Sequence, residues 1–237
     1  MCGGVGENTI MAILRFRLPA LLPVCMAGAL FAGHEGRNPQ WSEVRGNAQQ
    51  RPVPAKAAEE FRKSQEALRN GNLDQALHHL RRVVAFDRGN MDAYNELGVL
   101  YYSSNQPDKA IEAFSTMIAI DPRSYRAHVN LAFALNAQQR YREAEQVARR
   151  GVALRKMDLK MRYLLGMALA SQRKNLDEAA DNLSMAAEEY PEARLELSRM
   201  LVEKGDFERA MRELQRFTED RRFGEKYGVA PVQLFAK

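Results

Sequence analysis

Few side chains of this chain could bind a metal or take part in catalysis, and their spacing favours neither role. His78 and His79 are adjacent, so on a helix they point about 100° apart and cannot form the i, i+4 pair that chelates zinc. His128 stands alone, as a packed or groove-facing side chain does. Both cysteines, Cys2 and Cys25, precede the helical part of the chain, which therefore has no disulfide and no thiolate metal site.

The sequence also lacks the other patterns that indicate an active site. It has no nucleophile motif, no glycine-rich phosphate loop and no carboxylate pair at a fixed spacing. Its net charge of +5 and pI near 9.3 come from scattered basic residues rather than from one stripe beside a nucleic-acid reading element. We therefore predict a non-catalytic protein that binds no cofactor, no metal and no nucleic acid.

The sequence specifies side-chain size instead. The segment LGVLYYSSNQPDKAIEAFSTMIAIDP, residues 97–122, alternates small and large residues at fixed intervals and ends at a proline. Similar segments recur along the chain. When they are aligned, their central alanines are Ala76, Ala110, Ala144, Ala179 and Ala210. The separations of 34, 34, 35 and 31 residues are typical of a repeated helix pair.

This period and size pattern resemble the tetratricopeptide repeat, in which each unit is two antiparallel helices. The second unit matches the signature at Tyr94, Leu97, Gly98, Tyr101, Ala110, Phe114 and Pro122. The resemblance covers about residues 57–222 and implies an all-α TPR superhelix (an α-solenoid) of about five helix–turn–helix repeats. Small residues would lie where two backbones approach most closely, and large residues would fill the space beside them. Neighbouring units must stack, because none buries its apolar stripe alone.

The resemblance also implies where a partner binds, because the first helix of each repeat lines the concave surface in this family. The expected groove residues are Asn95, Val99, Tyr102, Arg126, Asn130, Phe133, Asn136, Lys160, Tyr163 and Met167. This mixture suits an extended protein segment or a partner helix, since amides can hold a backbone and aromatic rings supply buried area. A one-residue error in helix phase, about 100°, would instead place the three aromatic residues in the core between repeats. Only Asn130 and Lys160 match the clamp with which some members grip a C-terminal carboxylate, so we do not expect that ligand.

The N-terminal segment 1–33 is interpreted as a signal peptide or an N-terminal anchor. Arg15 and Arg17 precede an uncharged stretch at 18–33, which is short for a membrane span of about 20 residues. Residues 1–10 precede the pattern and are consistent with an upstream-start artefact. His34 occupies the position at which a bacterial lipoprotein carries its lipidated cysteine, so the sequence does not predict lipidation.

The remaining segments are expected to be irregular, and the whole layout indicates a role. Residues 34–56 read as a flexible linker and residues 223–237 as a C-terminal tail. An exported leader followed by a short TPR array resembles the assembly factors of type IV and Tad (Flp) pili. The expected function is a protein-binding scaffold in the bacterial periplasm or at a membrane of the envelope. There are two alternatives. One is an envelope adaptor that regulates cell-wall enzymes, and the other is a cytosolic co-chaperone or regulator if the leader is not a signal.

Overall fold

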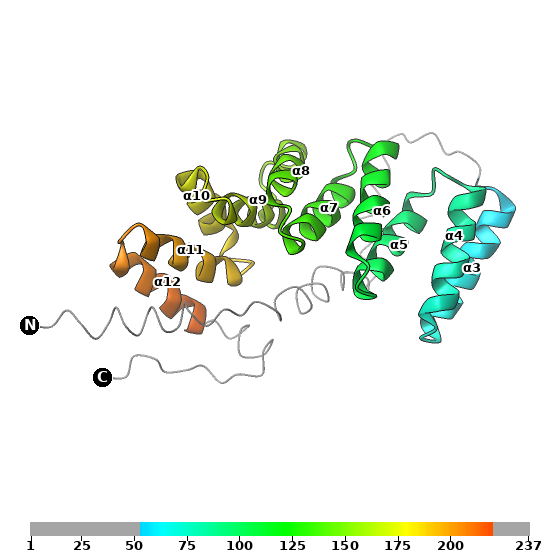
Figure 1. Ribbon diagram of the computed structural model, residues 1–237, viewed down its shortest axis with the longest axis horizontal. Helices are drawn as coiled ribbons and strands as arrows, with labels where there is room; N and C mark the ends of the chain where they lie inside the picture. Colours follow the sequence, from blue (N-terminus) through cyan, green and yellow to red (C-terminus); the bar gives the residue numbers. More distant parts are fainter. Residues whose placement is uncertain (1–52, 220–237) are drawn as a thin grey trace, which may run out of the picture. The chain divides into compact units, whose positions relative to one another are not determined.

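The computed structural model describes residues 53–219, and every regular element in this part of the chain is an α-helix (Figure 1). The predicted leader 1–33, most of the linker 34–56 and the tail 223–237 lie outside the described residues. The ten described helices are α3 (Ala55–Arg69), α4 (Leu73–Phe86), α5 (Met91–Ser103), α6 (Pro107–Ile120), α7 (Tyr125–Ala137), α8 (Tyr141–Leu154), α9 (Leu159–Ser171), α10 (Leu176–Ala186), α11 (Glu192–Glu203) and α12 (Phe207–Glu219). None of them combines the length and apolar character needed to cross a membrane.

The helices follow one another in five pairs joined by short turns, as the repeat pattern predicts. The all-α TPR solenoid is therefore confirmed. The described residues form two compact units, 53–127 and 128–219, whose boundary lies within α7. In the first unit α3 packs on α4 and α5 on α6, and in the second α9 packs on α10 and α11 on α12.

Side-chain size at the aligned positions produces the packing. The five aligned alanines, one on the second helix of each pair, are fully buried: Ala76, Ala110, Ala144, Ala179 and Ala210. Gly98 lies directly against the buried ring of Phe114, because a Cβ atom added to it would stand 2.3 Å from Phe114 Cε1. Gly166 makes a similar approach to Leu183, at 2.7 Å from Cγ. The glycines thus let the two helices of a pair approach closely.

The ends of the helices have local causes. Asn72, Asn90 and Asp158 each accept a hydrogen bond from a backbone N–H in the first turn of α4, α5 and α9, at 3.1, 2.9 and 2.9 Å, which stabilises a helix N-terminus. Helix α6 ends at Ile120, and Pro122 follows in the turn, as the repeat pattern predicts.

All five turns within the pairs share one backbone geometry. Each contains a residue in the left-handed region, namely Gly71, Asn105, Gln139, Arg173 with Asn175, and Gly205. A backbone N–H just beyond the first helix donates to a carbonyl five residues earlier, as from Asn72 to Ala67 at 2.8 Å and from Gln106 to Tyr101 at 2.8 Å. This is the Schellman motif, which satisfies the last carbonyls of a helix and reverses the chain.

Candidate partner-binding surfaces

The first unit places four polar side chains on neighbouring first helices. Gln65 on α3 donates from Nε2 to Oε1 of Glu96 on α5, at 2.5 Å. One turn away on α5, Asp92 accepts a hydrogen bond from Arg126 on α7, at 2.6 Å. Asp92 and Glu96 lie four residues apart and therefore share a helix face. The two carboxyl groups and their partners make this face of the unit polar.

Glu96 is the unusual member of this group. Its Oε2 atom is buried and has no hydrogen-bond partner among the described residues. The pKa of Glu96 is raised to about 7, chiefly by burial and also by the charge of Asp92, while the hydrogen bond from Gln65 and the nearby charge of Arg126 act to lower it. A buried acceptor without a donor costs about 1–3 kcal/mol. Because Oε2 is covered in this structure, a ligand would reach it only after a side-chain movement that uncovers it.

The second unit contains a comparable acceptor. Asn136, near the end of α7, donates from Nδ2 to the carbonyl of Leu164 on α9, at 3.0 Å. Its Oδ1 atom is buried and has no partner within the described part of the chain. The amide is held in place by one hydrogen bond while its other polar atom is unused. Asn136 was among the predicted groove residues, and this geometry suits that role.

The other predicted groove residues differ in exposure. Asn95, Asn130, Phe133 and Tyr163 are buried, whereas Val99, Tyr102, Lys160 and Met167 are half-buried and Arg126 is exposed. Phe133 is 5% exposed and Tyr163 is 4% exposed. The ring of Tyr163 stacks on Tyr190, with centroids 5.4 Å apart. The assignment of these ten residues to a groove stays a prediction.

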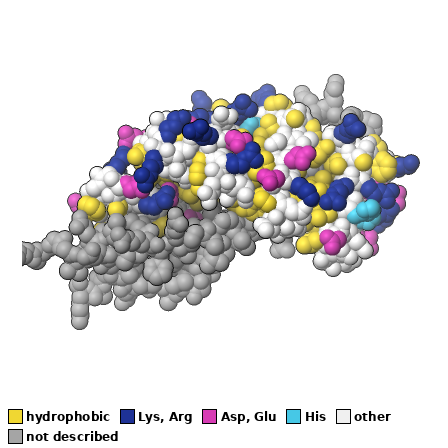
Figure 2. Space-filling view, in the orientation of Figure 1, with side chains coloured by type: hydrophobic (Ala, Val, Ile, Leu, Met, Phe, Trp, Pro, Cys, Tyr) yellow, Lys and Arg dark blue, Asp and Glu magenta, His cyan; other side chains and the backbone are white. Residues whose placement is uncertain are grey.

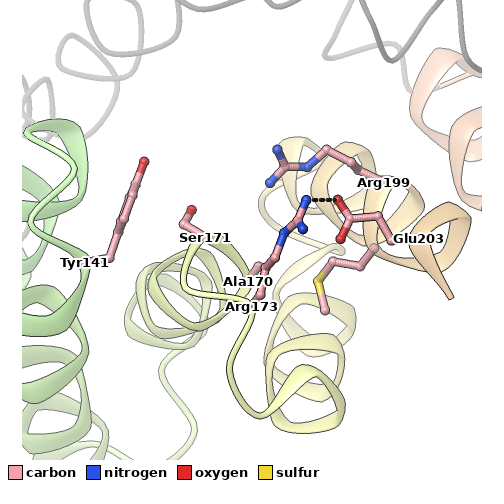
Figure 3. Close-up of a pocket in the computed structure, with 7 residues that line it drawn as sticks. Tyr141, Ala170, Ser171, Arg173, Arg199 and Glu203 are labelled. Atoms are coloured by element: carbon pink, nitrogen blue, oxygen red, sulfur yellow. Dashed lines mark hydrogen bonds and ion pairs between the residues drawn. The ribbon is translucent and has the colours of Figure 1, made fainter.

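A small pocket lies in the second unit where α9 ends beside α11 (Figure 3). Its volume is about 160 Å³, and it is lined by Tyr141, Ala170, Ser171, Arg173, Arg199, Met200 and Glu203. Figure 3 shows the side chains of Arg173 and Arg199 extending into the pocket, with Arg173 paired to Glu203 at 3.3 Å. Arg199 is paired to Glu196 outside the pocket. The pocket is polar, and its charges are largely neutralised by these pairs.

Three histidines lie in the described part of the chain, at positions 78, 79 and 128. His79 forms a hydrogen bond through Nδ1 with Oε2 of the buried Glu60 on α3, at 2.8 Å, and the rings of His78 and His79 meet edge to face. His128 is 1% exposed. Within residues 53–219 no three His, Cys, Asp or Glu side chains are grouped so that they could hold a metal ion.

Some residues of these surfaces were not predicted. Glu96 could have been found, because it lies one turn after Asp92 on the same helix face. Gln65 belongs to the first repeat, whose signature positions are weaker, and Tyr190 lies in a turn between repeats. The contact of Tyr190 with Tyr163 depends on how successive helix pairs pack, which residue spacing does not show.

Comparison with known proteins agrees with this architecture. Tetratricopeptide repeat profiles match residues 61–125, 102–168 and 161–193. The type IV pilus assembly protein PilF of Pseudomonas aeruginosa is 34% identical over 79 residues, a match that spans 33% of this chain and 31% of that protein. This chain therefore matches about a third of its relative's length.

Solved structures show the same fold. MamA from Desulfovibrio magneticus RS-1 superposes with a TM-score of 0.66 at 22% identity, covering 72% of this chain and 98% of that one. YrrB, described as a TPR protein with an unusual peptide-binding site, superposes with a TM-score of 0.60 at 20% identity, covering 69% and 85%. The matching profiles, which together span residues 61–193, and the five helix pairs show that this chain belongs to the tetratricopeptide repeat family of protein-interaction scaffolds.

Proposed function

We propose that this protein binds an extended segment of a partner protein along its first helices and serves the assembly of a pilus or secretion machine in the bacterial envelope. The observation that carries the proposal is a pair of buried acceptors that have no donor among residues 53–219, Glu96 Oε2 in the first unit and Asn136 Oδ1 in the second. Both lie on first helices, α5 and α7. An extended polypeptide presents regularly spaced backbone N–H groups, which would donate to these two atoms after a side-chain movement that uncovers them.

The role in the envelope is supported by likeness. PilF, the relative with 34% identity over 79 residues, is named as a type IV pilus assembly protein, and the segment 11–36 has the pattern of an export signal. Export would place the repeats in the periplasm or at a membrane, tethered if the leader stays attached. An adaptor for cell-wall enzymes would use the same helices with a different partner.

Two substitutions test the binding surface. Glu96→Leu and Asn136→Ala each remove an acceptor, and each should weaken capture of the native partner about fivefold to a hundredfold, as expected for a lost buried hydrogen bond of about 1–3 kcal/mol. The matched controls are Glu112→Leu on α6 and Gln146→Ala on α8, both at exposed positions on second helices. Capture is measured by pull-down from envelope extracts. Equal capture by all four variants would refute the assignment of binding to the first helices.

The cellular role needs a separate measurement. Deletion of the gene should reduce surface pili or the secreted product of the machine, and the wild-type chain should restore it. The mature N-terminus, measured by mass spectrometry of the native protein, should fall near residues 30–34. A chain that begins at Met1 or Met11 in the cytosolic fraction would contradict the envelope role and favour a cytosolic regulator.

A further inference from the structure

Charged side chains of α8 and α10 pair with one another on the surface of the second unit. The guanidinium group of Arg149 on α8 donates to both carboxylate oxygens of Glu178 on α10, at 2.6 and 2.8 Å. Lys174, just before α10, lies 3.6 Å from Glu145 on α8. These pairs link the two second helices through their side chains. Figure 2 shows basic and acidic side chains close together on the surface of this part of the molecule.

The α8 side of this surface is basic. Arg142 and Arg150 on α8, and Lys156 in the turn that follows, are exposed, and none forms an ion pair with another described residue. The acidic side chains of α8 are already neutralised, because Glu143 pairs with Arg140 at 2.7 Å and Glu145 pairs with Arg149 at 3.0 Å. We call Arg142, Arg150 and Lys156 the basic stripe.

The α10 side is acidic. Helix α10 contains no lysine or arginine. Asp177 is 95% exposed and pairs with Lys204, and Glu188, just after the helix, is 84% exposed and pairs with Arg194, so the charge of both is partly neutralised. Asp181 lies between them, exposed and without an ion pair to any described residue. We call Asp177, Asp181 and Glu188 the acidic stripe. Met185, 51% exposed, lies on the same face of α10.

The two stripes occupy equivalent heights, because their helices are equivalent elements of successive repeats. Ala144 on α8 is aligned with Ala179 on α10. Arg142 therefore corresponds to Asp177, and Arg150 corresponds to Met185, which lies between Asp181 and Glu188 in the sequence. A twofold axis parallel to the helices would lay α8 of one copy on α10 of another, and α10 on α8. In a twofold interface each contact occurs twice.

We propose that this surface binds a second copy of the chain, with the basic stripe of each copy against the acidic stripe of the other. Met185 would be covered in the contact and add apolar burial. An anionic lipid surface is a poorer occupant, because it would attract the basic stripe and repel the acidic stripe only one helix away. A second copy complements both at once. The net charge of +5 opposes association only weakly, since salt screens charges beyond about 10 Å.

Charge reversal tests the proposal by sedimentation equilibrium of the full chain. One variant, Arg142→Glu with Arg150→Glu, makes both stripes acidic, and a second, Asp177→Lys with Asp181→Lys, makes both basic. Each should dimerise at least about tenfold more weakly than the wild type at about 50 mM salt, since like charges then face each other. An equimolar mixture of the two should form a heterodimer, because both halves of the interface become complementary again. The chain that carries all four changes should dimerise with itself.

The control variant makes the same arginine-to-glutamate changes on a different helix. Arg209→Glu with Arg212→Glu reverses two exposed arginines on α12 and should dimerise as the wild type does. Circular dichroism of each variant should show the same helicity as the wild type. A wild type that stays monomeric at low salt, a dimer unaffected by either reversal, or failure of the mixture to associate would each overturn the proposal.

Discussion

The contrast between two helical glycines tests the packing of the repeats quantitatively. A Cβ atom added to Gly98 would stand 2.3, 2.6 and 2.7 Å from three ring carbons of Phe114, whose side chain is fully buried. A Cβ added to Gly151 would stand 2.2 Å from Cε and 2.7 Å from Sδ of Met161. The two overlaps are similar in size. The neighbours differ, because one is a rigid ring and the other is the flexible end of a methionine.

This difference sets the expected free energies. Overpacking against Phe114 should cost about 1–3 kcal/mol, while replacing a mid-helix glycine by alanine gains about 0.5–1 kcal/mol. Gly98→Ala should therefore lower the free energy of unfolding by up to about 2.5 kcal/mol. Met161 can move its terminal atoms at little cost, so Gly151→Ala should leave stability unchanged or raise it by up to about 1 kcal/mol.

Urea unfolding followed by circular dichroism measures both values. Phe114→Leu supplies a cross-check, because the shorter side chain makes room for the new methyl group. It should cost at least about 1 kcal/mol less in the Gly98→Ala background than in the wild type, as coupled neighbours do. Equal destabilisation by Gly98→Ala and Gly151→Ala, or additive effects at Gly98 and Phe114, would refute this account of the packing.

Two further predictions concern a buried charge and the repeat register. Burial raises the pKa of Glu96 from 4.5 to about 7. Between these two pH values the folded protein binds more protons than the unfolded chain, so the free energy of unfolding falls as the pH rises from 4.5 to 7. Glu96→Gln should make the free energy of unfolding less dependent on pH and should stabilise the protein at about pH 8 by roughly 1–2 kcal/mol, a figure reduced because Glu96 is only partly buried. An unchanged pH dependence would contradict the burial of the Glu96 carboxyl group. Ala110→Trp should lower the free energy of unfolding by about 1–3 kcal/mol or more, whereas Lys109→Trp, at an exposed position, should change it little. Equal melting temperatures of the two variants would show that the alignment of the repeats is wrong.

The sequence predicted the core of the fold because close packing restricts residue size. The five aligned alanines are fully buried, and the approach of Gly98 to Phe114 follows from the size pattern. The turns were harder to predict. A left-handed residue is most often glycine, yet Asn105, Gln139 and Arg173 hold this conformation here, because the Schellman hydrogen bonds of the turn stabilise it.

The candidate site was less accessible to sequence reasoning. Periodicity places Tyr102, Phe133 and Tyr163 at comparable positions on their helices, but Tyr102 is half-buried and the other two are buried. Their exposure depends on residues from other helices, which a single helix period does not describe. The raised pKa of Glu96 also arises from three-dimensional burial. The spacing indicated the helix face, and the structure was needed to find the acceptors without donors.

Site-specific photo-crosslinking tests the central claim most directly. A photoreactive amino acid is placed at Val99 on α5 or at Met167 on α9, both half-buried positions on first helices, and at the exposed Glu112 on the second helix α6 as the control. Irradiation in the native host should give a partner adduct from Val99 or Met167 and none from Glu112, and Glu96→Leu should reduce the adduct formed at Val99. Adducts from Glu112 alone would contradict binding along the first helices.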